Sequence, residues 1–170
     1  MLENRVFLRA GFLGFLLLTP FSLAFSAGSE TAIQIDVPVK LHSAKVVFNL
    51  DHLAFQADLP IGMKYMGLLS DRFKEQAAKS IIVGVFHGDA GYMTLNDAAY
   101  NAARKVDSGN PYRGILAKLL EKGVQLEECA VTMKANNWSN KDLLPGVKVN
   151  TGAVIRLIQL NQEGYSEIHP

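Results

Sequence analysis

The segment SIIVGVF, from Ser80 to Phe86, is apolar at nearly every position. A strand with one face in water alternates apolar and polar residues, whereas a strand buried on both faces does not. Strands of the second kind occur in parallel sheets that helices cover on both sides. This segment therefore predicts an α/β protein with a buried strand at 80–86.

The rest of the chain alternates between strand-like and helix-like patterns. Strands are also expected at 45–50, 124–131, 147–150 and 165–168, and helices at 60–77, 95–104, 110–123 and 151–164. This order favours a mostly parallel sheet with helices on both faces. The predicted fold class is α/β, a single-domain three-layer αβα sandwich with about five strands, flavodoxin/Rossmann-like.

Two of the expected helices carry an apolar stripe. In the helix at 110–123, Asn110 suits the cap, Pro111 the first turn and Gly123 the end. The predicted core stripe of this helix is Tyr112, Ile115, Leu116, Leu119 and Leu120. For the helix at 60–77, the predicted buried face is Ile61, Tyr65, Leu68, Leu69 and Phe73.

The chain begins with a pattern that is typical of a secretory signal peptide. Arg5 and Arg9 precede an uncharged apolar stretch, 10–27, that ends in small residues. The alternative is a lone transmembrane anchor, but Pro20 near the middle of the stretch favours cleavage. We expect a signal peptide at 1–27, a mature start between Phe25 and Ser29, and a periplasmic location.

The remaining chain reads as an extended arm at 28–43 followed by one domain at 44–170. About 143 residues remain after cleavage, with 15 basic and 15 acidic side chains. A nucleic-acid partner is not expected, because binding to phosphates needs a basic surface. No further long apolar run follows the leader, so no membrane association is expected once the leader is removed.

Cys129 is the only cysteine of the chain. Exported domains often use paired cysteines, whereas a single one indicates an intermolecular bridge or a free reactive thiol. The other interpretation is a buried cysteine that serves as a small apolar residue. Cys129 falls at the carboxyl end of the expected third strand, the edge at which α/β proteins bind their ligands.

Several kinds of chemistry are not expected. The first strand is not followed by G-x-G-x-x-G and there is no P-loop, so no nucleotide or other cofactor is predicted. No metal site is predicted, because the four histidines lack the short spacings of ligand pairs. These are His42, His52, His87 and His169. A dithiol oxidoreductase would need a second thiol.

A single thiol can still act as a nucleophile or as a carrier. A cysteine hydrolase would need His87 as the base and Asp89 or Asn137 to orient it. A carrier would hold sulfane sulfur as a persulfide, which is a reversible modification of exposed cysteines with a low pKa. Glu127 would raise the thiol pKa, whereas His87, Lys134 and a helix start near Thr132 would lower it, so the direction stays open.

The candidate pocket around the thiol is drawn from the ends of neighbouring strands. The turn after the second strand could offer N–H groups to an anion, or could be an ordinary turn. Trp138 could cover the thiol or pack a loop. The predicted pocket residues beside Cys129 are His87, Gly88, Asp89, Thr132, Lys134 and Trp138.

Three segments resemble a known family. C-x-x-T-M-K at 129–134 followed by DLLPGVKV at 142–149, together with VGVFHGDAG at 83–91, is similar to the DsrE/DsrF-like sulfur-relay superfamily. The resemblance covers roughly Ala44 to His169. It implies an αβα fold, a homotrimer or homohexamer, and persulfide sulfur on the cysteine at the position of Cys129. Characterised relay proteins are cytoplasmic, whereas this chain begins with an export signal.

Two functions of different class follow from these patterns. The first is a periplasmic sulfur carrier that uses Cys129 and exchanges sulfur with donor and acceptor proteins or small thiols. Whether this would make it a sulfurtransferase-like enzyme stays open. The second is a non-catalytic, oligomeric periplasmic binding module with a pocket for a small anion or a partner near His87.

Overall fold

The structure of the chain is a computed structural model that describes residues 33–170. The expected signal peptide at 1–27 and the first part of the expected arm lie outside the described residues. The chain divides into two compact units, Met1–Pro38 and Val39–Pro170. In the first unit, residues 33–38 are exposed and contain no helix or strand. The second unit holds the sheet and the helices.

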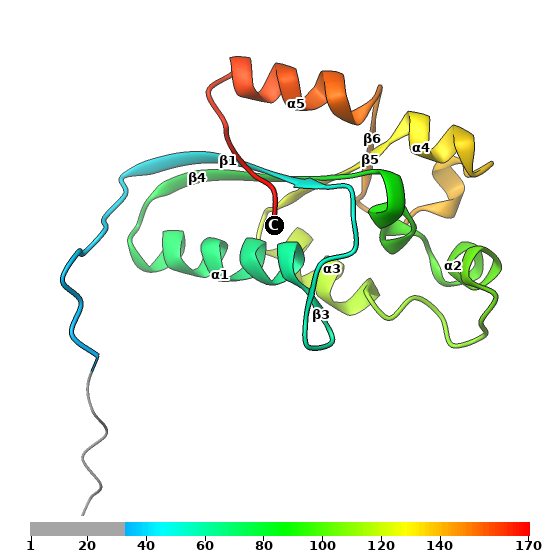
Figure 1. Cartoon of the computed structure of the whole chain (residues 1–170), viewed down its shortest axis with the longest axis horizontal. Coiled ribbons are helices and arrows are strands. Elements are labelled where there is room, and N and C mark those ends of the chain that lie inside the picture. The colour runs from blue at the N-terminus through cyan, green and yellow to red at the C-terminus, as the bar shows by residue number, and fades with distance from the viewer. Residues whose placement is uncertain (1–32) are drawn as a thin grey trace, which may run out of the picture. The chain divides into compact units, whose positions relative to one another are not determined.

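A parallel sheet forms the centre of the second unit (Figure 1). Among the described residues it has five strands in the order β6-β5-β4-β1-β7, and every neighbouring pair is parallel. The strands are β1 Ser43–Leu50, β4 Lys79–Phe86, β5 Gln125–Cys129, β6 Lys148–Asn150 and β7 Ser166–Ile168. A small antiparallel ribbon, β2 Phe55–Gln56 and β3 Leu59–Pro60, follows β1.

Helices cover both faces of the sheet. They are α1 Ile61–Glu75, α2 Asp97–Arg104, α3 Arg113–Glu121, α4 Ala130–Ala135 and α5 Ala153–Gln162, with short 3₁₀ helices at η1 Gly88–Thr94 and η2 Asn140–Asp142. Figure 1 shows α1 and α3 on one face and α5 on the other. After β1, the chain adds β4, β5 and β6 one after another on one side of β1. It then returns and adds β7 on the other side of β1. Right-handed crossovers place the helices of these two paths on opposite faces. The predicted three-layer α/β fold is confirmed.

The sheet separates two apolar cores. On β4, Ile82 and Phe86 point toward the larger core under α1 and α3, while Val83 and Val85 point toward α5. The smaller core contains Val47, Val83, Val85, Cys129, Ala153, Leu157 and Leu160. Burial on both faces explains why 80–86 is apolar almost throughout.

The predicted buried face of the first helix was wrong for Tyr65 and Leu68, whereas Phe73 is buried and Leu69 packs against the larger core. Tyr65 and Leu68 are exposed, and α1 instead buries Gly62, Met63, Met66 and Phe73. The reason lies in Gly84 on β4, where an added Cβ would come within 2.9 Å of the Met66 sulfur. The missing side chain leaves a notch that the flexible methionine fills, and this sets the rotation of the helix.

The third strand ends earlier than the predicted 124–131. β5 stops at Cys129 and α4 begins at Ala130, so the apolar Val131 is 65% exposed on a helix. Cys129 therefore stands at the junction of a strand and a helix. None of the helices within 33–170 is both long and apolar enough to cross a bilayer.

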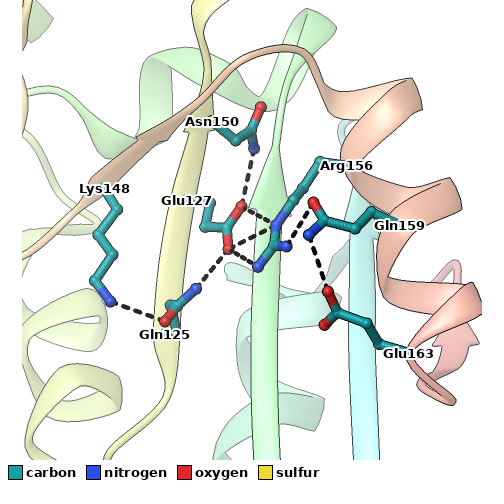
Figure 2. A network of polar contacts seen from close by, with 7 residues as sticks. All are labelled: Gln125, Glu127, Lys148, Asn150, Arg156, Gln159 and Glu163. Atoms are coloured by element: carbon teal, nitrogen blue, oxygen red, sulfur yellow. Dashed lines mark hydrogen bonds and ion pairs between the residues drawn. The ribbon is translucent and has the colours of Figure 1, made fainter.

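An ion pair between a half-buried arginine and a buried glutamate joins α5 to the sheet (Figure 2). Arg156 of α5 donates to both carboxylate oxygens of Glu127 on β5, through Nε at 3.1 and 3.0 Å and through Nη2 at 2.9 Å. Asn150 and Gln125 donate to the same carboxylate. Burial raises the pKa of Glu127, but the hydrogen bonds from Arg156 and Gln125 outweigh burial, and the net shift is downward.

We expect Arg156→Ala to lower the free energy of unfolding by about 3 kcal/mol, because it leaves a buried carboxylate without its counter-charge. Urea unfolding at neutral pH measures the change. Adding Glu127→Gln to Arg156→Ala should restore most of the loss. Gln159→Ala, which removes only an exposed part of the same network, is the control and should change stability little. An unfolding midpoint of Arg156→Ala equal to that of the wild type would contradict the prediction.

Candidate functional site

The carboxyl ends of the strands bring several candidate residues to one edge. Cys129 ends β5 and is paired with Asn150 on β6, while Glu128 is paired with Phe86 on β4. His87 follows Phe86 directly, so it lies level with Cys129 on the neighbouring strand. Strand alternation turns both side chains toward the face that α5 covers.

The thiol of Cys129 lies beneath the starts of α4 and α5. It is 4% exposed, and the N–H of Ala153 donates to Sγ at 3.3 Å. Burial raises the thiol pKa, but hydrogen bonds from the backbone N–H groups of Thr132 and Ala153 and from the Thr132 hydroxyl outweigh it, so the pKa is lowered. The sequence left open whether the thiol pKa is raised or lowered, and the N–H groups at the helix starts lower it. Lys134, the charged residue that was expected to contribute, is exposed.

Thr132 connects the thiol to the segment after β4. Its hydroxyl oxygen accepts a hydrogen bond from the N–H of Gly88 at 3.0 Å, which leaves its own proton free for the thiol. Gly88 has a φ of +54°, and a Cβ there would come within 2.9 Å of the Asp51 carbonyl oxygen. Only glycine fits this turn without strain, so the turn, the hydroxyl and the sulfur form one connected unit.

Of the seven predicted site residues, four line a common groove of about 720 Å³ and three do not. Gly88, Asp89, Thr132 and Trp138 are part of its wall. His87, Lys134 and Cys129 are not. The groove wall also includes Val131, Tyr92 and Arg104, whose guanidinium lies 4.3 Å from the centre of the Tyr92 ring. The thiol is therefore not part of the groove wall, although Val131 and Thr132 belong to the surroundings of both.

His87 does not act on the thiol in this structure. Its Nε2 lies 2.8 Å from Oδ1 of Asn49 on β1, and burial lowers the pKa of the ring. No hydrogen bond joins His87 to Cys129 within residues 33–170. The arrangement that a cysteine hydrolase would need is not assembled: Asp89 faces the groove, and Asn137 is exposed.

Glu128 is a buried group that the sequence analysis missed. It is fully buried on the face of β5 opposite Cys129, where its Oε2 accepts from the Thr94 hydroxyl at 2.8 Å. Its Oε1 has no hydrogen-bond partner among the described residues, and it would lie 2.8 Å from a Cβ at Gly91. Burial raises the pKa of Glu128 to about 9. Strand alternation next to Cys129 was the signal that could have placed it in the larger core.

Comparisons with known proteins agree with this fold. The sequence model of the DsrE/DsrF-like family matches residues 39–170. Two similar solved structures are a protein of unknown function, MTH1491, from Methanobacterium thermoautotrophicum and the ychN protein from E. coli. Their identities to this chain are 21% and 15%, and their TM-scores are 0.58 and 0.54. Each match covers 75% of this chain and 99% of the other. The sequence matches none of the curated proteins with which it was compared.

Thr132→Val should raise the pKa of the Cys129 thiol by about one unit or more, because a hydrogen bond to a charged group contributes about 1.5–3 kcal/mol. The thiolate absorbance at 240 nm, titrated against pH and corrected with Cys129→Ser, measures the shift. Thr132→Ser keeps the hydroxyl and should titrate like the wild type. An unchanged midpoint in Thr132→Val would show that the hydroxyl does not stabilise the thiolate.

Glu128→Gln should change how stability depends on pH. The folded-state pKa of about 9 lies above the ordinary value of 4.5, so the folded chain holds one more proton between these values. The free energy of unfolding of the wild type therefore falls with rising pH across this window, by about 1.4 kcal/mol per pH unit from this group alone. Glu128→Gln should lack this contribution and should exceed the wild type in stability at pH 8.

Urea unfolding from pH 5 to 8 tests this difference. The stabilities of Glu128→Gln and the wild type should converge as the pH approaches 5. Glu121→Gln, at an exposed position of α3, is the control and should follow the wild-type profile. Parallel profiles for Glu128→Gln and the wild type would contradict a buried, protonated carboxyl group.

Proposed function

Because the chain belongs to the DsrE/DsrF-like family, which is related to sulfur relay, we propose that it is a sulfur carrier that holds a persulfide on Cys129. The observation that carries this proposal is the position of the thiol at the carboxyl edge of the sheet. There it receives N–H groups from the starts of two helices. These donors favour the thiolate, which is the nucleophilic form.

The proposed reaction transfers one sulfur atom. The Cys129 thiolate attacks the outer sulfur of a donor persulfide, a Cys129 persulfide forms, and the sulfur–sulfur bond of the donor breaks to release the donor thiolate. An acceptor thiolate later attacks the outer sulfur of the Cys129 persulfide and restores the thiolate of Cys129. Each step exchanges one sulfur–sulfur bond for another, so no external oxidant or reductant is needed.

Loading requires access to a thiol that is 4% exposed. The side chain of Val131 is close to Gly152, since an added Cβ there would lie 3.5 Å from Val131 Cγ2. Gly152 precedes Ala153, whose N–H contacts the sulfur. We infer that the donor reaches the thiol where Val131 moves aside, because Val131 is itself largely exposed and belongs to a helix of only six residues.

The cellular context is part of the same proposal. The leader at 1–27 favours export to the periplasm, and the family favours self-association as a homotrimer or homohexamer. The outer face of α5 supports self-association, because Val154, Ile155 and Ile158 are exposed there. Donor and acceptor would be proteins or small thiols.

A non-catalytic binding module remains the second candidate, and two observations favour it. The thiol is buried among apolar side chains, and the groove beside α4 is large enough for a small ligand or for the side chains of a partner. In this interpretation Cys129 only fills the core between the sheet and α5, and the ligand or partner binds in the groove beside Trp138.

Intact mass spectrometry distinguishes the two candidates. The purified mature chain is treated with a low-molecular-weight persulfide or polysulfide and measured without reductant. A carrier should gain roughly 32 Da, one sulfur atom, and lose it on reduction. Cys129→Ser should gain nothing. The same spectra give the mature amino terminus, which we expect between Phe25 and Ser29 for chain recovered from the periplasm.

An unchanged mass in the wild type, with a thiol that resists alkylation until the protein unfolds, would reject the carrier and favour the binding module. A gain of mass that persists in Cys129→Ser would also reject the carrier, because the sulfur would then be bound elsewhere. Thr132→Val is a further comparison, since a higher thiol pKa should slow loading at neutral pH without changing the gain in mass that is finally reached.

A further inference from the structure

A second group of reactive side chains lies at the same edge of the sheet, apart from the thiol. Oδ1 of Asp51 lies 2.5 Å from Nδ1 of His52 and 2.8 Å from Nε2 of His169. All three ligand atoms are within 4.8 Å of one another. The three side chains are between 37% and 51% exposed, so an ion from solution can reach them.

The fold brings these residues together although Asp51 and His169 are 118 positions apart. Asp51 follows the end of β1, and His169 follows the end of β7, which is the parallel neighbour of β1. The Asp51 carbonyl oxygen accepts a hydrogen bond from the N–H of Asp89 at 2.9 Å, which fixes the backbone on one side. On the other side, Pro170 packs close to Gly62, where an added Cβ would lie 3.1 Å from the proline ring.

The two imidazole rings approach the carboxylate from different directions. Their centres are 5.0 Å apart and their planes are inclined by 84°, an edge-to-face arrangement. One nitrogen of each ring therefore points at the same oxygen of Asp51. In such an arrangement a single cation can replace the protons that the rings now share with the carboxylate.

We propose that Asp51, His52 and His169 bind a divalent transition-metal ion of the zinc class, with a fourth position open to solvent. Two imidazole nitrogens and one carboxylate oxygen suit such an ion, whereas magnesium and calcium prefer oxygen ligands. In a tetrahedral site with bonds of about 2.0–2.2 Å, neighbouring ligand atoms are about 3.4 Å apart. The pairs at 2.5 and 2.8 Å thus need to open by less than about 1 Å, which exposed side chains achieve by rotation.

The proposed ion would fasten the end of β7 to the end of β1. β7 contains three residues and is an edge strand, and all three are exposed. A side-chain hydrogen bond of 3.0 Å, from Asn49 on β1 to Glu167 on β7, also joins the two strands. Binding to the folded chain alone stabilises it in proportion to RT ln(1 + [ion]/Kd), so the ion should raise the unfolding temperature. This proposal does not depend on the sulfur chemistry of Cys129.

The experiment is calorimetric titration of the untagged mature chain with Zn²⁺, with thermal unfolding measured in parallel. The wild type should bind about one ion per chain and unfold at a higher temperature with the ion. His169→Ala and His52→Ala should each weaken binding at least tenfold and lose the thermal shift, as expected when one of three ligands is removed. His42→Ala, a histidine outside the cluster that is also exposed, is the matched control and should behave like the wild type.

Circular dichroism of each variant without the ion verifies that it is folded. Cys129→Ser should bind Zn²⁺ as the wild type does, and loss of binding in this variant would overturn the proposal by placing the ion on the thiol. Absence of stoichiometric binding, or equal affinity of His169→Ala and wild type, would also overturn it. Sulfur loading of His169→Ala, followed by mass, should stay normal, which separates this result from a failure of the carrier proposal.

Discussion

The ion pair between Glu127 and Arg156 determines how the thiol is surrounded. It ties the first turns of α5 to β5 through both carboxylate oxygens. Cys129 lies two residues after Glu127 on the strand, and Ala153 lies three residues before Arg156 in the helix. The N–H of Ala153 donates a hydrogen bond to the sulfur of Cys129. A salt bridge that is buried in this way contributes little net stability, but it fixes one orientation of the helix. The geometry of the sulfur site depends on that orientation.

The two neighbouring glutamates of β5 show how strand alternation gives adjacent residues opposite properties. Glu127 faces α5, and its pKa is lowered because the hydrogen bonds of Arg156 and Gln125 exceed the effect of burial. Glu128 faces the larger core without a counter-charge, and burial raises its pKa to about 9. At neutral pH one carboxylate is paired and the other carboxyl group is protonated. Neither adds an uncompensated negative charge beside Cys129, so the N–H groups of the helix starts can lower the thiol pKa.

The sequence predicted the fold well because its signals are local and repeated. An apolar strand, the alternation of strands with helices and a family-like motif around Cys129 all indicated a parallel sheet within a three-layer fold. The orientation of α1 was not predictable in the same way, since it depends on the notch that Gly84 offers to Met66. The cluster of Asp51, His52 and His169 was missed for a related reason. Spacing rules detect ligands on one element, whereas these residues meet only because β7 returns to lie beside β1.

The separation of the thiol from the groove bears on both candidate functions. Sequence reasoning placed Cys129 and the pocket residues in one site, because all of them follow strand ends. In the structure Cys129 does not line the groove, but Val131 and Thr132 belong both to the groove wall and to the surroundings of the sulfur. The Thr132 hydroxyl also accepts a hydrogen bond from the N–H of Gly88, which belongs to the same groove wall. A molecule in the groove would therefore contact the residues that cover the thiol and set its pKa. If the proposed carrier chemistry takes place at Cys129, one short helix would couple it to binding in the groove, and a carrier that must recognise its donor before exposing its thiol would need such a coupling.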